Sequence, residues 1–394
     1  MRVLITDGDT RQALAATRSL GHAGHVVFVA SDRLPSLAGQ SRYAASSVLC
    51  PSPVKRSAEF VDFVSELAAG QGLEAILPMT EISTLLLTGN RDRLPPGCGL
   101  PFPDHDAVRR ASNKAEMIEL ARGLGVPVPE TTIFARPGEW AVLDQVREYP
   151  AVIKPACSRV RTDSGWISNS VSYARDREAL FDRLSSMPRE SFPVLVQERI
   201  RGPGVGVFML CEHGRPTARF AHRRIREKPP SGGVSVLCES APVDETAAAH
   251  AAALLNNLGW SGPAMVEFKR DLRDGSLRLM EVNGRFWGSL QLAVDAGVDF
   301  PALLVQAAAG LVPSSMPAYR YGLRCRWLAG DVDALLLVLL KRRQTLDLPP
   351  EHPGRLRSIR DFLHVWDRET RYESERWDDL APARLEWRRR LLGG

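Results

Sequence analysis

Short apolar runs alternate with longer amphipathic segments through about residue 105 of the chain. The apolar runs have the length of buried strands and lie at residues 2–6, 25–30 and 74–77. The amphipathic segments have the spacing of helices and lie at 11–20 and 57–69 and after Glu81. Strands that alternate with helices in this way predict a parallel sheet covered by helices.

A different pattern begins at Asn113, where a helix-capping residue is followed by Glu116. Pro127 and Pro129 end this helix, and from residue 150 onward short strands and hairpins dominate. Strands are expected at 150–154, 170–173, 194–199, 204–211, 215–222, 234–239, 264–270 and 277–283, and helices at 176–185, 244–258, 289–296 and 299–309. The last stretch, 330–394, is predicted to be helical and is rich in Arg and Trp.

The composition is that of a folded globular protein, because 44% of the 394 residues are hydrophobic and 25% are charged. The net charge is +5, and the basic residues are interleaved with acids, so we expect no nucleic-acid partner. The six cysteines form no C-x-x-C pair, which favours a reducing compartment. The longest apolar run, Ala334–Leu340, is far shorter than the ~20 residues of a membrane span, and no signal-peptide pattern is present. We therefore expect a cytoplasmic protein with no membrane partner.

Two of the expected strands are joined by a short turn and carry the acids of a candidate metal site. A three-residue loop ending at Gly275, with this glycine in the left-handed conformation, pairs Leu272 with Ser276. The same register pairs Glu267 with Glu281, and both carboxylates then lie on one face of the hairpin. A two-residue turn would instead place them on opposite faces.

Asn283 and Arg285 follow Glu281 at alternating positions and therefore share its face. Two carboxylates and a carboxamide oxygen are hard ligands of the kind that Mg²⁺ prefers. A guanidinium beside them is suited to hold negative charge on a phosphoryl group or a tetrahedral intermediate. An exposed face whose acids pair with nearby arginines is the alternative interpretation of the same pattern.

Several short motifs between residues 112 and 285 follow one another in a recognisable order. They are Ser112-Asn113-Lys114, Gly125-Val126-Pro127-Val128-Pro129, Ala151-Val152-Ile153-Lys154-Pro155, Val194 to Gly202, and Glu267 with Met280-Glu281-Val282-Asn283-Gly284-Arg285. In this order the chain resembles the ATP-grasp superfamily over about residues 1–310, in particular carboxylate-amine ligases and the subunits of carbamoyl phosphate synthase and biotin carboxylase.

The resemblance implies an α/β and α+β protein, an ATP-grasp fold with an N-terminal Rossmann-like preATP-grasp domain and a helical C-terminal extension. The implied divisions are a preATP-grasp domain at 1–112, a small lid subdomain at 113–196, a large sheet domain at 197–325 and the extension at 326–394. No role for the extension follows from the resemblance, and a homodimer surface is one hypothesis for it.

The resemblance also implies an ATP site. Lys114 and Lys154 would contact the phosphates, which fits their being two of only six lysines in an arginine-rich chain, since a compact ammonium suits a crowded phosphate. The adenine would be held by the hinge residues Gln197, Glu198, Arg199 and Ile200.

By the same resemblance Glu267, Glu281 and Asn283 would bind Mg²⁺ or Mn²⁺, and Arg285 would stabilise the acyl-phosphate and tetrahedral intermediates. Two segments depart from the family pattern. The acidic ribose ligand expected after the hinge is replaced by residues 202–206, which are rich in glycine. The phosphate-covering loop at 156–165 carries arginines in place of several glycines.

Other residues are candidates for holding substrates. Arg223 and Arg224 precede a diglycine loop and, together with Ser231, Gly232 and Gly233, could bind an anion. Glu81, after a strand of the first domain, could hold an ammonium group, and Trp287 could line the substrate pocket. Each also has a purely structural interpretation. The arginines and the diglycine loop could form a solvated hairpin, Glu81 could be an acid at the start of a helix, and Trp287 could be a buried aromatic residue.

The expected function is an ATP- and Mg²⁺-dependent ligase that activates a carboxylate as an acyl phosphate and joins it to an amine, releasing ADP and phosphate. Its partners would be these two small molecules. One alternative is an ATP-dependent carboxylase or carbamoyl-phosphate-type enzyme that phosphorylates bicarbonate. The other is a non-catalytic ATP-binding protein, because the ribose acid is missing and the phosphate loop is unusual.

Overall fold

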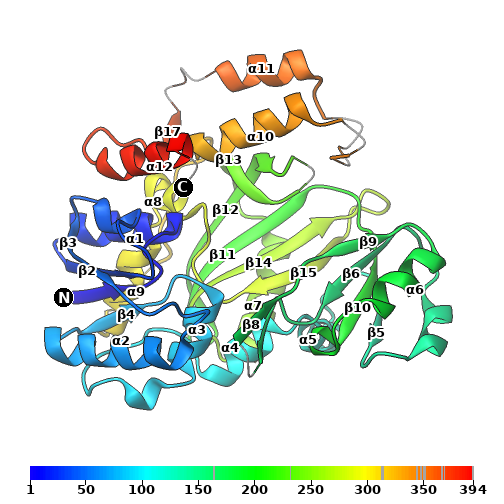
Figure 1. The fold of residues 1–394 in the computed structure, drawn as a ribbon, viewed down its shortest axis with the longest axis horizontal. Helices are drawn as coiled ribbons and strands as arrows, with labels where there is room; N and C mark the ends of the chain where they lie inside the picture. The colour runs from blue at the N-terminus through cyan, green and yellow to red at the C-terminus, as the bar shows by residue number, and fades with distance from the viewer. Residues whose placement is uncertain are drawn as a thin grey trace.

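The computed structural model describes residues 1–162, 165–230, 232–311, 315–342, 345–346, 348, 352–364, 367 and 369–392. Figure 1 shows the arrangement of these segments, with the N-terminal layer in blue, the central sheets in green and yellow, and the C-terminal helices in orange and red.

The N-terminal layer is a four-stranded sheet whose neighbouring strands are all parallel, as the alternating pattern predicts. Its strands, in the spatial order β3-β2-β1-β4, are β1 (Arg2–Ile5), β2 (Val26–Ser31), β3 (Ala44–Leu49) and β4 (Ala75–Leu77). Its helices are α1 (Arg11–His22), α2 (Ser57–Gln71), α3 (Glu81–Thr88) and α4 (His105–Ser112). α1 begins at Thr10 and α3 at Thr80, and each of these threonine side chains caps the first turn of its helix.

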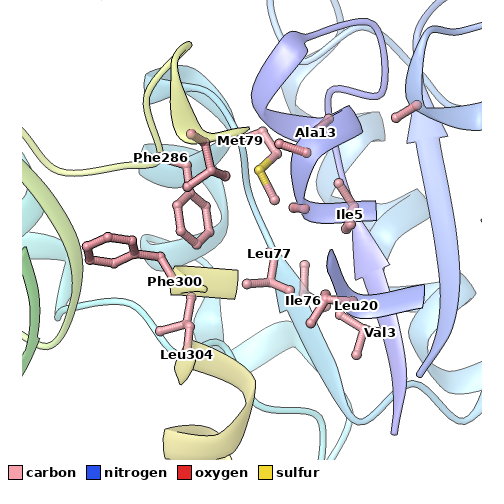
Figure 2. Packing of buried hydrophobic residues seen from close by; sticks show 14 of the residues in the cluster. Val3, Ile5, Ala13, Leu20, Ile76, Leu77, Met79, Phe286, Phe300 and Leu304 are labelled. Carbon is pink, nitrogen blue, oxygen red and sulfur yellow. The ribbon is translucent and has the colours of Figure 1, made fainter. Parts of the chain in front are cut away.

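The core of the N-terminal layer extends into a later part of the chain. Figure 2 shows Leu77 and Met79 packed against Phe286 and Phe300, which come after the central sheet in sequence. These side chains belong to one buried cluster with Val3 and Ile5 of β1 and with residues of the next two helices. Those helices are α8 (Leu290–Ala296) and α9 (Phe300–Ala308). The shared core therefore fixes the segment after residue 283 against the first domain.

A smaller antiparallel sheet lies in the segment expected to be the lid subdomain, and we call this part of the chain the lid. Its strands, in the spatial order β5-β10-β6-β9, are β5 (Thr131–Phe134), β6 (Ala151–Pro155), β9 (Ser172–Ala174) and β10 (Val194–Glu198). The hairpin β7 (Arg159–Thr162) and β8 (Gly165–Ser168), the helix α6 (Arg177–Ser185) and the connecting helix α5 (Lys114–Gly123) complete it. The Asn113 side chain caps α5 as expected, accepting hydrogen bonds from the backbone N–H groups of Ala115 and Glu116.

The central sheet has seven strands in the order β15-β14-β11-β12-β13-β16-β17. They are β11 (Gly204–Glu212), β12 (Arg215–Lys228), β13 (Val234–Ser240), β14 (Gly262–Arg270), β15 (Leu277–Asn283), β16 (Arg324–Arg326) and β17 (Thr370–Tyr372). Helix α7 (Glu245–Asn257) packs on this sheet over a second core that contains the fully buried Trp260.

The C-terminal extension covers one end of the central sheet (Figure 1). Its helices are α10 (Leu328–Leu340), α11 (Arg355–Leu363) and α12 (Ala381–Leu392). α10 packs against β12 and β13, and β17 adds a parallel strand beside β16. The extension is thus helical with one strand that belongs to the central sheet.

Two of the expected domain boundaries fall inside strands. A boundary between residues 196 and 197 cuts β10, all of which pairs within the lid sheet. A boundary between residues 325 and 326 cuts β16, which pairs with β13 on one side and β17 on the other. We find no single helix in the described ranges with the length and apolarity to cross a membrane, although the bent pair α8 and α9 meets both criteria when taken together.

Candidate active site

The β14–β15 hairpin pairs Glu267 with Glu281, as the sequence predicts. The expected turn is nevertheless wrong, because the backbone N–H of Asp271 donates to the Ser276 carbonyl at 2.8 Å and extends the loop by one residue. That longer loop shifts the register by one position, and a β-bulge after Glu267 restores it. Gly275 is left-handed with φ +72°, as expected.

The side chains after Glu281 form a connected polar cluster. The Asn283 carboxamide donates to a Glu281 carboxylate oxygen at 2.9 Å. The Arg285 guanidinium lies 3.5 Å from the side-chain oxygen Oδ1 of Asn283 and donates to the Phe286 backbone carbonyl at 2.9 Å. The expected sharing of one face by Glu281, Asn283 and Arg285 is therefore present in the structure.

Two lysines from the lid approach this cluster. Lys114 is the first residue of α5, and its Nζ donates to Ser158 Oγ at 2.8 Å. It lines a pocket together with Glu81, Glu281, Asn283 and Arg285. Lys154 lies on β6, and its charge acts on Glu281 together with those of Lys114 and Arg285.

The two acids of the hairpin differ in their electrostatic environment. Burial raises the pKa of Glu267, and the neighbouring Glu281 adds to this effect against the opposing charge of Arg224. Burial acts in the same direction on Glu281, but Lys114, the Asn283 hydrogen bond and the other nearby cations outweigh it and lower its pKa. Burial also lowers the pKa of Lys154 to about 8, against the attraction of Glu281. These groups form a tightly coupled cluster of opposite charges.

The donor set fits a magnesium ion that a nucleotide would also coordinate. Glu267 and Glu281 supply two facing carboxylates, and Asn283 supplies a carbonyl oxygen beside them. Within the described residues no group of three or more His, Cys, Asp and Glu side chains could hold a metal ion. Mg²⁺ commonly takes only one or two carboxylates and completes its shell with water and phosphate oxygens, which agrees with this arrangement.

The expected adenine hinge lies where β10 ends. Gln197 is buried and its carboxamide donates to Thr131 Oγ1 at 2.9 Å. Glu198 accepts a hydrogen bond from the Glu130 backbone N–H at 2.8 Å. The Arg199 guanidinium lies over the Tyr173 ring at 5.3 Å, and Ile200 is buried. Three of these side chains are thus engaged with neighbours in the lid, and the adenine-binding role of this segment stays a prediction.

The two candidate anion-binding arginines have different acidic partners. Arg224 forms an ion pair with Glu267 of the β14–β15 hairpin, whereas Arg223 forms an ion pair with Glu239 of β13 at 2.7 Å. Gly232 and Gly233 lie between β12 and β13, and the Gly233 carbonyl accepts a hydrogen bond from Arg224 at 3.5 Å. Ser231 lies outside the described residues.

Trp287 is buried, as the alternative interpretation of the sequence has it. Its side chain lies between Phe208 and Phe300, with ring centroids at 4.4 and 5.0 Å. A role for Trp287 in binding substrate stays a prediction. Glu81, in contrast, lies in the pocket beside Lys114 and Arg285, and burial raises its pKa.

Two residues near the site were missed in the sequence. Ser158 holds Lys114, and Lys269 Nζ reaches the Ile200 backbone carbonyl at 3.4 Å, next to the expected hinge. A signal for Lys269 was present, because lysine is scarce in this chain and Lys269 follows Glu267 by two positions on β14. Nothing in the local sequence distinguishes Ser158 from other loop serines.

Comparisons with known proteins bear on the fold of the chain. The family model described as "ATP-grasp in the biosynthetic pathway with Ter operon" matches residues 190–330, which include the hairpin. A search of curated proteins by sequence finds no match.

Solved structures resemble the chain over most of its length. The L-amino acid ligase of Bacillus licheniformis is 17% identical, with a TM-score of 0.58, covering 81% of this chain and 75% of its own. The biotin carboxylase of Campylobacter jejuni is 16% identical, with a TM-score of 0.63 and coverages of 80% and 72%. The N5-carboxyaminoimidazole ribonucleotide synthetase of Thermus thermophilus is 18% identical, with a TM-score of 0.59 and coverages of 80% and 80%. These likenesses and the family match confirm the resemblance inferred from sequence, and the chain has the ATP-grasp fold.

Proposed function

We propose that the chain is an ATP- and Mg²⁺-dependent ligase that phosphorylates a carboxylate and joins the resulting acyl phosphate to an amine. The observation that carries the proposal is that Lys114, Glu281 and Arg285 line one pocket. The charge of Lys154, on β6, also acts on Glu281, and Glu267 pairs with Glu281 across the hairpin. One structural neighbour, an L-amino acid ligase, supports the same reaction class.

In the proposed reaction the acid's carboxylate oxygen attacks the γ-phosphorus of ATP, and ADP leaves. The amine then attacks the acyl carbon and forms the amide, releasing phosphate and a proton. Mg²⁺ on Glu267, Glu281 and Asn283 would offset phosphate charge. Lys114 and Lys154 would hold the phosphates in place, which is most of what a protein does in phosphoryl transfer.

Arg285 would act on the acid rather than on the nucleotide. Its guanidinium is held by the Phe286 carbonyl and lies beside Asn283, so its orientation is fixed before substrate binds. A planar guanidinium can hold the oxygens of the acyl phosphate and then the oxyanion formed when the amine attacks. Fixing this charge in advance avoids reorganisation during the reaction.

The test is release of ADP and AMP from Mg-ATP with pooled carboxylates, pooled amines and bicarbonate, added singly and together. The ligase predicts ADP release that requires both an acid and an amine. Glu281→Gln should lower the rate of ADP release by about 100-fold or more, because it removes a carboxylate that would hold Mg²⁺ against the phosphates. Glu119→Gln, an exposed change on α5, is the matched control and should leave the rate unchanged.

Other outcomes would reject the proposal. Release of AMP would exclude an acyl phosphate, and ADP release that requires bicarbonate and no other acid would favour a carboxylase. Binding of Mg-ATP without turnover in any mixture would favour a non-catalytic role.

A further inference from the structure

A second cavity, which we call the cap cavity, lies between the edge of the central sheet and the C-terminal extension. It measures about 520 Å³ and is lined by residues of β12, β13 and β16 on one side and of α10 and α11 on the other. Cavities that hold small-molecule ligands commonly measure about 300–1,000 Å³. The C-terminal extension therefore encloses a space of the size that a small molecule fills.

Apolar side chains line both sides of the cap cavity. They are Leu237 of β13 on one side, and Ala334 and Val338 of α10 and Phe362 of α11 on the other. Ala334 and Val338 lie one helical turn apart, so both project from the same face of α10. An apolar group of a ligand would find its contacts against this face.

Charged side chains also line the cap cavity. Five arginines line the cap cavity against three acids, namely Glu227, Asp331 and Asp361. Arg226 and Arg326 both donate to the buried carboxylate of Asp331, which holds the two guanidinium groups in fixed orientations. A guanidinium has five N–H donors, so one carboxylate partner does not exhaust its capacity for a second anion. The other three arginines also have acidic partners, since Arg223 and Arg324 pair with Glu239 and Arg224 pairs with Glu267. The N–H donors that these pairs do not use favour a ligand with a negative charge.

Arg224 connects this cavity to the candidate active site. It lines the cap cavity and also forms an ion pair with Glu267 of the catalytic hairpin. A carboxylate bound at the Arg224 end of the cavity would thus lie close to the acids proposed to hold the metal. The apolar body of the same molecule would extend away from the hairpin, toward α10.

We propose that the cap cavity binds the acid substrate, and that this substrate is a carboxylate with an apolar body. The proposal rests on the proposed ligase function for the fate of the carboxylate. It assigns the C-terminal extension the task of selecting the acid, with α10 contacting its apolar part and Arg224 its charged end.

The test is isothermal titration of the full chain with 1-naphthylacetate and octanoate, which combine a carboxylate with an apolar body. Acetate provides the charge alone and 1-naphthylacetamide the apolar body alone. Both acids should bind at least about tenfold more tightly than either control, which is about 1.4 kcal/mol. Equal binding of the amide, or no binding of either acid, would overturn the proposal.

Two adjacent leucines of α10 provide matched variants. Leu335 lines the cap cavity, whereas Leu336 is exposed and does not. Leu335→Trp should fill the space and weaken acid binding by about tenfold or more, and Leu336→Trp should leave it unchanged. Ala334→Phe gives a second filling variant should the first disturb folding, and a thermal shift with Mg-ADP reports on folding in each.

The two proposals fail in different ways. Acid-dependent ADP release that Leu335→Trp does not alter would overturn the cap cavity as the acid site and leave the ligase standing. Failure of every acid to promote ADP release, with 1-naphthylacetate still bound in the cap cavity, would reject the ligase and with it the substrate role of the cavity.

Discussion

His222 is a buried imidazole in the middle of the central sheet. It is hydrogen-bonded to Ser289 Oγ at 2.9 Å and stacks on Phe208 with ring centroids 4.7 Å apart. Burial lowers its pKa from 6.5 to about 3, and the nearby charge of Arg224 acts in the same direction. The unfolded chain therefore takes up a proton between pH 6.5 and 3 that the folded chain does not.

This difference predicts that the free energy of unfolding falls as the pH falls through that window. The contribution of His222 is at most about 1.4 kcal/mol per pH unit. His222→Phe keeps the ring but cannot titrate, so its stability should decline less steeply between pH 6.5 and 4.5. Urea unfolding of both proteins at several pH values gives the two slopes, and parallel curves would contradict the prediction.

Gly284 lies directly between Asn283 and Arg285, so its surroundings bear on the candidate site. A Cβ at this position would lie 2.3 Å from the ring of Trp260, which is fully buried and cannot move aside. Gly284→Ala should destabilise the protein by about 1–3 kcal/mol, as overpacking of cores usually does. It should also weaken Mg-ADP binding, because the neighbouring side chains are displaced.

Gly204→Ala is the control for this substitution. Gly204 lies on β11, and nothing in the described structure comes within 4 Å of a Cβ placed there. The two variants are compared by urea unfolding, and Gly284→Ala is compared with the unchanged protein by titration with Mg-ADP. If the Gly284→Ala protein were as stable as the Gly204→Ala protein, the Trp260 ring would have moved to make room for the methyl group, and the prediction would be wrong.

At the level of single elements, the β14–β15 hairpin shows what the sequence could and could not predict. The predicted pairing of Glu267 with Glu281 is correct because a β-bulge after Glu267 compensates for a turn one residue longer than expected. The length of the turn was not predictable, because it depends on contacts made within the folded turn. One of these is the hydrogen bond that the Arg273 backbone N–H donates to the Asp271 carboxylate at 3.0 Å. The bulge that compensates for the longer turn depends on both strands and leaves no local signal.

Short strands were missed for a related reason. β3 carries alanine and serine rather than a run of branched residues, and β16 and β17 have three residues each. Such segments become strands because a neighbouring edge offers hydrogen bonds, and not because of their own preference. Longer segments with a strong periodic pattern, such as α1 and β2, were predicted correctly.

Helix α10 is joined to the central sheet by a buried ionic cluster. Asp331 of α10 and Arg326 of β16 are each 1% exposed, and Arg226 of β12 adds a second guanidinium. Asp331→Asn leaves both arginines without their anion and should destabilise the protein by about 3–5 kcal/mol. Asp144→Asn removes an exposed ion pair with Arg177 and should cost no more than about 0.5 kcal/mol. Urea unfolding of the two asparagine variants checks the contrast, and similar losses would contradict it.

On the scale of the whole molecule, the C-terminal extension is attached to the N-terminal domain as well as to the sheet. Arg389 of α12 pairs with Asp9 at 2.7 Å, and Arg11 of α1 pairs with Glu373 at 2.6 Å. The partners are more than three hundred residues apart, so no local pattern in the sequence could reveal them. The Arg and Trp content of the extension indicated helices but not what they would contact.

Arg18 and Asp379 form the most buried of these connections. Arg18 donates to the Asp379 carboxylate at 2.8 Å and to the Glu373 carbonyl at 2.6 Å. Asp379 also accepts hydrogen bonds from Ser41 Oγ at 2.7 Å and from the Arg42 backbone N–H at 2.9 Å. Asp379 keeps two hydrogen-bond donors when Arg18 is removed, whereas Arg18 has no other carboxylate partner among the described residues. Removing the Asp379 carboxylate should therefore destabilise the protein more than removing the Arg18 guanidinium.

We expect Asp379→Ala to destabilise the protein by about 3–5 kcal/mol and Arg18→Met by less, since methionine refills the space without a charge. The double variant should lose less than the sum of the two, because each single change leaves the other partner unpaired. The extension packs against both the first domain and the central sheet, so we expect every variant to unfold in a single transition. The transitions followed by far-UV and by near-UV circular dichroism should then coincide. A separate early transition in Asp379→Ala, with the rest of the curve unchanged, would instead show that the extension docks as an independent unit.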